Sequence, residues 1–140
     1  MAWWDIFRRD VTELFTSSKT RGERRQCEFH LKVAEPMREA ALGSDEQAWK
    51  TYFDELGRAV AALPSSVEAR YLRSQASLHW FTSMRPSTPD LTFRELARTW
   101  DRDLKHILTN FPDKAPASMS LREAREMRAE YDRICRGIHV

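Results

Sequence analysis

The sequence predicts an all-α protein: a single domain over residues 1–140, built as a bundle of five to six antiparallel helices. Apolar residues recur every three or four positions through most of the chain, which is the spacing of one helix face. The chain contains only 4 Gly and 6 Pro, fewer than a sandwich of short strands with frequent turns requires. With 140 residues, 41% of them hydrophobic, it can bury a core without a disulfide or a metal ion.

Five capping boxes mark where helices should begin. In this pattern a Ser or Thr is followed three positions later by Glu or Gln, and each side chain bonds the backbone N–H of the other residue. The pairs are Thr20/Glu23, Ser44/Gln47, Ser65/Glu68, Thr92/Glu95 and Ser120/Glu123. Each stands directly before a stretch with helical apolar spacing, so each predicts a helix start.

In the first predicted helix, residues 2–16, five apolar residues share one face. They are Trp4, Phe7, Val11, Leu14 and Phe15. Trp3 and Ile6 lie off this face, where a solvated helix carries polar residues, and aromatic anchors are enriched at interfaces. We therefore expect Trp3 and Ile6 to bind a partner, with this helix as a docking arm. The alternative is that its apolar face fills the core of the bundle. Binding to a membrane is not expected, because acidic residues outnumber basic ones in this segment.

Residues 21–42 are ambiguous. From Cys27 to Val33 apolar and polar residues alternate, as in a strand. As a helix, the segment has an apolar arc over somewhat more than half of the helical wheel. The arc comprises Cys27, Phe29, Leu31, Val33, Ala34, Met37, Ala40 and Ala41. We predict a helix kinked near Pro36, which removes one backbone hydrogen bond, and keep a hairpin strand as the alternative for residues 27–33.

Four further helices are expected, at residues 45–63, 66–84, 92–110 and 120–137. The first of them has a single apolar stripe and ends at Pro64. The second is apolar on two sides, which is typical of a helix sandwiched between neighbours. A break with Pro86 and Pro89, residues 85–91, separates it from the third.

The corner Leu63-Pro64-Ser65-Ser66 and the two helices that it joins resemble one tetratricopeptide-type hairpin. The resemblance covers about 35 residues, and no 34-residue period recurs elsewhere in the sequence. It therefore supports the helical hairpin and does not indicate a repeat protein.

No motif for catalysis is present: there is no glycine-rich phosphate loop, nucleophile elbow, zinc-protease motif or paired cysteine motif. We expect a protein that is not an enzyme and has no cofactor. Asp103 and His106 could face one metal ion, but nothing marks the further ligands, so a solvated pair is expected. Cys27 and Cys135 are too far apart in the sequence for a zinc site, and we expect two reduced, buried thiols.

Positive charge is carried mainly by arginine. Of 23 basic residues 18 are Arg, against 21 acidic residues, for a net charge of +2. The Arg guanidinium binds phosphate and carboxylate at two points and is desolvated more easily than an ammonium group. This composition favours anionic partners; the alternative is that it reflects a GC-rich genome.

The sharpest charged feature is a row of cations in residues 92–110. It consists of Arg94, Arg98, Arg102 and Lys105, which form one stripe opposite Trp100. Like charges four positions apart destabilise a helix by about 0.2–0.5 kcal/mol per pair. Their spacing of about 6 Å along the axis approximates that of successive phosphates on a strand. The stripe predicts contact with a phosphate backbone; the alternatives are a solvated charged face and an acidic protein partner.

A second basic set lies near the start of the segment 21–42. Its members are Lys19, Arg21, Arg24, Arg25 and Lys32, and the last four are predicted nucleic-acid contacts. The predicted helix 66–84 adds Arg70 and Arg73 between its two apolar faces. In the helix 120–137, acidic residues stand at pairing distance from the arginines, so a salt-bridged surface is expected there.

These observations favour a non-catalytic helical accessory subunit of a nucleoprotein assembly. It would hold the phosphate backbone of RNA or single-stranded DNA through its arginines, without base readout, and pack on other protein subunits or on a second copy of itself. In size and build the chain is similar to the small helical subunits of RNA-guided CRISPR effector complexes, a likeness of fold without a shared motif. The alternative is an adaptor, chaperone or inhibitor acting by protein–protein contact. A cytoplasmic location is expected, because the sequence has neither a signal-peptide pattern nor an apolar run of about 18 residues.

Overall fold

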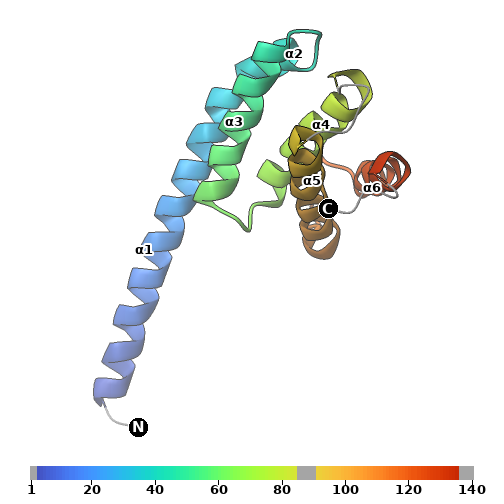
Figure 1. The fold of residues 1–140 in the computed structure, drawn as a ribbon. Coiled ribbons are helices and arrows are strands. Elements are labelled where there is room, and N and C mark those ends of the chain that lie inside the picture. The colour runs from blue at the N-terminus through green and yellow to red at the C-terminus, as the bar shows by residue number, and fades with distance from the viewer. Residues whose placement is uncertain (1–2, 85–90, 136–140) are drawn as a thin grey trace.

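The computed structural model describes residues 3–84 and 91–135, with side chains for residues 19–84 and 92–135. The described residues form helices that pack together, with no strand among them (Figure 1), so the all-α fold class is confirmed. None of the helices in these ranges combines the length and apolar character needed to cross a membrane.

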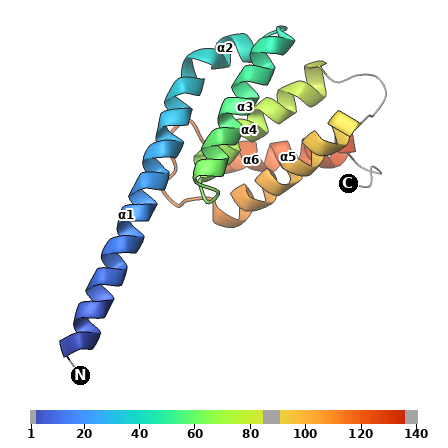
Figure 2. The ribbon, with the colours of Figure 1, turned by 60° about the vertical axis from the view of Figure 1, so that its left-hand side comes forward.

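The first helix, α1 (Trp3–Ala34), is one continuous helix of 32 residues. The prediction of separate helices at 2–16 and from 21 is wrong, and Thr20 lies inside α1 instead of capping a helix. The residues between the two predicted segments are neither Pro nor Gly, and each costs a helix at most about 0.7 kcal/mol relative to Ala. The N-terminal half of α1 extends past the end of α3 and away from the other helices (Figures 1 and 2).

A kink was predicted near Pro36, and the structure has a full interruption of the helix there. Pro36 lies in a short 3-10 turn, η1 (Glu35–Met37), which leads into the four-residue helix α2 (Arg38–Ala41). Because Pro lacks the backbone N–H that would continue the ladder, the helix ends there. The helical interpretation of residues 27–33 is confirmed.

Helices α3 (Glu46–Ala62) and α4 (Val67–His79) form the predicted hairpin, but each is capped one residue later than expected. Asp45 accepts hydrogen bonds from the backbone N–H of the second and third helical residues of α3 at 3.0 and 3.2 Å. Ser66 accepts one from Ala69 in α4 at 3.1 Å. Asp and Ser are equally good caps, so neighbouring candidates compete closely.

As predicted, α4 is buried on two sides. It packs against α3, α5 (Leu91–Asn110) and α6 (Leu121–Cys135), and it continues as a π-helical turn, η2 (Trp80–Met84). The predicted break at residues 85–91 falls, apart from Leu91, outside the described residues, as do the last predicted residues of the helix 120–137.

The capping-box prediction is confirmed at α6, where the Ser120 hydroxyl accepts a hydrogen bond from the N–H of Glu123 at 3.2 Å. Thr92, in contrast, is already inside α5. The start of α6 is also tied to α4, because the Tyr71 hydroxyl accepts from the Ser120 N–H at 3.1 Å and donates to its carbonyl at 3.4 Å. Burial raises the pKa of Tyr71 to about 12.

An aromatic cluster fixes how α5 is turned about its axis. The Trp100 ring is fully buried, stacks on Phe81 at 5.1 Å between centroids and meets Tyr131 of α6 edge-on at 5.4 Å. Phe93, about two turns earlier on α5, meets Phe81 edge-on at 4.9 Å. With these rings held inward, the opposite side of α5 faces the solvent.

Candidate nucleic-acid interface

Three arginines on the outer side of α5 form what we call the α5 arginine stripe: Arg94, Arg98 and Arg102. All three side chains are exposed, whereas Trp100 and Leu104 on the other side of the helix are fully buried. No ion pair or hydrogen bond joins a stripe arginine to another described residue. Glu95 and Asp101 border the stripe, and Asp101 is already paired with Lys105 and Arg128, so the face carries a net positive charge.

Lys105, the fourth predicted member, is engaged differently. Its Nζ lies 2.9 Å from Oδ2 of Asp101, whose other oxygen accepts a hydrogen bond from Arg128 of α6 at 2.7 Å. Burial alone would raise the pKa of Asp101, but the bonds from Lys105 and Arg128 outweigh it and lower that pKa below its usual value. Lys105 is therefore part of a bridge between α5 and α6, and its charge is largely compensated.

Asp103 lies on the buried side of α5 and is 0% exposed. Arg70 donates to its Oδ1 at 2.9 Å, and Arg73 donates to both carboxylate oxygens at 2.7 Å. We call these residues the Asp103 triad. The prediction of a solvated pair with His106 is wrong, since that ring bonds the Ser65 carbonyl at 3.2 Å instead. A buried carboxylate needs cations and hydrogen bonds, and two arginines of α4 supply both.

Beside the triad a hollow of about 300 Å³ opens between α3, α4 and α5. We call it the arginine hollow, and its polar lining consists of Arg70, Arg73, Thr99 and Arg102. Apolar residues of α3 and the α3–α4 turn form the rest, and no carboxylate is among the lining residues. Arg102 belongs both to the stripe and to the hollow, so the two are continuous.

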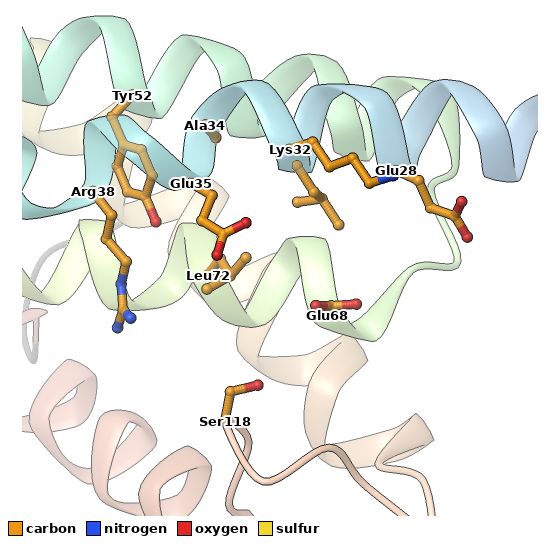
Figure 3. Close-up of a pocket in the computed structure, with 10 residues that line it drawn as sticks. Glu28, Lys32, Ala34, Glu35, Arg38, Tyr52, Glu68, Leu72 and Ser118 are labelled. Atoms are coloured by element: carbon orange, nitrogen blue, oxygen red, sulfur yellow. The ribbon is translucent and has the colours of Figure 1, made fainter.

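A second hollow, of about 340 Å³, has the opposite character (Figure 3). It lies between α1 and α4, and its charged lining comprises Glu28, Glu35, Glu68, Lys32 and Arg38. Carboxylates outnumber cations there, so the cleft does not favour an anion. The structure thus places Lys32, one of the predicted contacts, among glutamates.

The other predicted contacts on α1, Arg21, Arg24 and Arg25, are exposed on residues 19–34 of that helix. One turn beyond Arg25 lies Phe29, which is 61% exposed and meets the His30 ring edge-on at 5.4 Å. The expectation that Phe29 belongs to the buried arc is wrong. Two residues before it, Cys27 faces the interior, and two helical positions turn a side chain by about 200°.

The remaining site predictions have separate outcomes. Trp3 and Ile6 lie in the first turns of α1. The structure describes their backbone and not their side chains, so their role as partner contacts stays a prediction. Cys27 and Cys135 are buried thiols and form no disulfide, as expected. The salt-bridged surface of α6 is confirmed, with Arg122 and Arg133 each paired to a glutamate of the same helix at 3.1 and 2.6 Å.

No group of three or more metal-ligating side chains occurs in the part of the chain that the structure describes. His30 lies 2.5 Å from the buried carboxylate of Glu55, which also accepts a hydrogen bond from Arg58 at 3.0 Å. His79 bonds the carbonyl of Gly43 at 2.8 Å. Both rings are partly buried and hydrogen-bonded, as expected from the sequence.

No protein-family model, curated protein or solved structure matches the chain.

Proposed function

We propose that the protein is a non-catalytic, nucleic-acid-binding subunit that holds a phosphate backbone along α5. The observation that carries this proposal is the α5 arginine stripe, whose three exposed guanidinium groups have no carboxylate partner among the described residues. A helix selected only for stability would place acids between such residues, because like charges four positions apart are unfavourable. Bound phosphate groups would neutralise the positive charges of the stripe and relieve their mutual repulsion, which would favour binding.

The geometry of the stripe suits a backbone better than bases. Successive arginines are separated by four residues, a rise of about 6 Å, along a helix that the aromatic cluster and the Asp103 triad hold in one orientation. An arginine side chain can donate hydrogen bonds to two oxygens of one phosphate group, and such a contact does not depend on the base sequence. The expected partner is therefore RNA or single-stranded DNA, contacted without base readout.

Three phosphate contacts alone give weak, salt-sensitive binding. The proposed setting is accordingly an assembly in which other protein subunits, or further copies of this chain, add contacts. An additional contact is offered on α1 by Arg24, Arg25 and Phe29, because an unpaired base can stack on an exposed aromatic ring that lies beside cations.

Fluorescence anisotropy with a labelled single-stranded RNA at low salt tests the proposal. The variant with Arg94→Gln, Arg98→Gln and Arg102→Gln should lose most of its affinity. For single strands, log K falls with log salt by about 0.7 per phosphate contact, so the slope should decrease by about 2.

The matched control changes three exposed cations that each pair with a glutamate: Lys50→Gln, Arg122→Gln and Arg133→Gln. It removes the same charge from positions that are already salt-bridged, so affinity and slope should change little. If both variants bind RNA as the unmodified chain does, the proposed function is wrong.

The second candidate function is binding to a protein partner, and the projection of α1 favours it (Figures 1 and 2). In the described part of the chain no other helix lies beside the N-terminal half of α1, yet its sequence carries apolar residues at helical spacing. Changing Trp3→Asp and Ile6→Asp in the full chain should weaken assembly, measured by light scattering, and leave the melting temperature unchanged. A lowered melting temperature with intact assembly would show that this helix serves folding instead.

A further inference from the structure

We propose that the arginine hollow binds a phosphate monoester, the terminal phosphate group of a nucleic-acid strand that lies on the α5 arginine stripe. This inference rests on the proposed function and deepens it, because it assigns one end of the bound strand to one place on the protein. The ligand class is a dianionic phosphate with three terminal oxygens, since the second proton of a phosphate monoester is lost near pH 6.

The hollow has hydrogen-bond donors left over after the Asp103 triad is formed. Arg70 uses Nε on the Pro64 carbonyl, at 2.8 Å, and Nη1 on Asp103. Arg73 uses Nε and Nη2 on the same carboxylate. Nη2 of Arg70 and Nη1 of Arg73 make no hydrogen bond to another described residue, and Arg102 and Thr99 add a whole guanidinium and a hydroxyl.

The charge of the hollow matches such a ligand. Three guanidinium groups line it, and the buried Asp103 carboxylate cancels one of them, which leaves a formal excess of two positive charges. Arg70 and Arg73 are 16% and 14% exposed, so their charges are screened less by solvent than those of the stripe. A dianion compensates the excess fully, whereas a phosphodiester within a strand carries a single charge.

The position and size of the hollow favour a strand end over an interior linkage. A phosphodiester continues in two directions, whereas the stripe joins the hollow at Arg102 and the lining residues on the α3 side, Val60, Ala61 and Pro64, are apolar. Its volume of about 300 Å³ is roughly ten times the 30 Å³ share of one water molecule, enough for a phosphate group with part of its hydration shell. The strand would therefore begin in the hollow and run along α5 toward Arg94.

The experiment compares the full chain with three labelled RNA oligonucleotides of one sequence: 5′-phosphorylated, 3′-phosphorylated, and with hydroxyls at both ends. One of the phosphorylated forms should bind about tenfold more tightly than the hydroxyl form at low salt, because a terminal phosphate adds charge-assisted hydrogen bonds that a hydroxyl end cannot make. The single variant Arg102→Gln should reduce this preference at least fivefold, and so should the double variant Arg102→Gln with Thr99→Val. These changes leave the Asp103 triad in place, so the fold is retained.

Arg94→Gln is the matched control, because it removes the same charge from the far end of the stripe. It should weaken all three oligonucleotides by the same factor and keep the preference. Inorganic phosphate at millimolar concentration should remove the preference without displacing the hydroxyl oligonucleotide.

The outcomes separate this inference from the proposed function. Equal binding of the three oligonucleotides overturns the terminal-phosphate site and leaves the stripe standing, whereas no binding of any of them overturns both. A preference that survives saturating inorganic phosphate, or one that Arg94→Gln removes as fully as Arg102→Gln does, also overturns the assignment to the hollow. Binding of inorganic phosphate as tight as that of the strand end would make the hollow a site for the free ion instead.

Discussion

The arginines on the two sides of α5 are in opposite situations. On the inner side, the two arginines of the Asp103 triad are mostly buried and share one carboxylate through hydrogen bonds of 2.7–2.9 Å. On the outer side, the α5 arginine stripe is exposed and has no carboxylate partner among the described residues. The inner group contributes to holding α4 against α5, while the outer group contributes little to folding and is available to bind an anion. The number of arginines in a sequence therefore says less about function than their position relative to carboxylates.

The largest effect should come from removing the carboxylate of the inner group. Asp103→Ala leaves two buried guanidinium groups without their partner, and breaking a buried pair in this way costs about 3–5 kcal/mol. The free energy of unfolding, measured by urea denaturation and circular dichroism, should fall by that amount. Asp101→Ala on the same helix is the matched control, and it should cost only about 1 kcal/mol because its ion pairs are partly exposed.

A second variant separates charge from packing. If Asp103→Leu is combined with Arg70→Met and Arg73→Met, the buried charges disappear together, and much of the lost stability should return. A variant no more stable than Asp103→Ala would mean that the triad also serves the shape of the core.

Alkaline pH should weaken the interior of the bundle while both arginine groups stay charged. Burial raises the pKa of Tyr71 and of Tyr131 to about 12, against 10 in the unfolded chain. The folded state binds these protons more tightly, so the stabilisation is complete below pH 10 and is lost as the pH rises toward 12, by about 2 kcal/mol per tyrosine. Burial also raises the pKa of Cys27, which contributes in the same direction from about pH 9.

Urea denaturation at pH 8.5 and pH 11.5 measures this loss. Tyr71→Phe should reduce the difference between the two pH values, because one of the titrating groups is gone. An equal difference in the variant would contradict the contribution of that hydroxyl.

The smallest effect on stability should come from giving the outer group the carboxylate that the inner group already has. Arg94→Glu places an acid four positions before Arg98, near the N-terminal end of α5, which replaces an unfavourable pair with a favourable one and suits the helix dipole. The free energy of unfolding should rise by about 0.5–1 kcal/mol, and RNA affinity should fall. If the free energy of unfolding and the RNA affinity both rose or both fell, the contrast between the inner and outer arginines would be contradicted.

Most of the fold follows from local signals in the sequence. Pro64 follows the end of α3 and Pro36 interrupts the helix that begins with α1. The single apolar stripe of α3 and the two apolar sides of α4 are the faces that these helices bury. The continuity of α1 could not be predicted, since a Thr-to-Glu spacing caps a helix only where the preceding chain is not already helical. Thr20 satisfies the pattern and lies inside the helix nonetheless.

The candidate site was predicted in part. Its exposed members could be identified because Arg94, Arg98 and Arg102 lie opposite Trp100 on any helical wheel. The burial of Asp103 was missed, although a signal existed: it stands four residues before Ile107, a core residue, and α4 carries two arginines between apolar faces. To join these facts one must know that α4 packs against α5, and that contact is tertiary.

The length of α1 also determines the shape of the protein in solution. A helix of 32 residues is about 48 Å long at 1.5 Å per residue, whereas a compact chain of 140 residues has a radius of gyration of only about 14 Å. The scattering profile should therefore contain interatomic distances that a globular particle of this mass lacks, and one element should account for them. Because α1 is a single rod, any molecule held at its N-terminal end would turn with the bundle as one body.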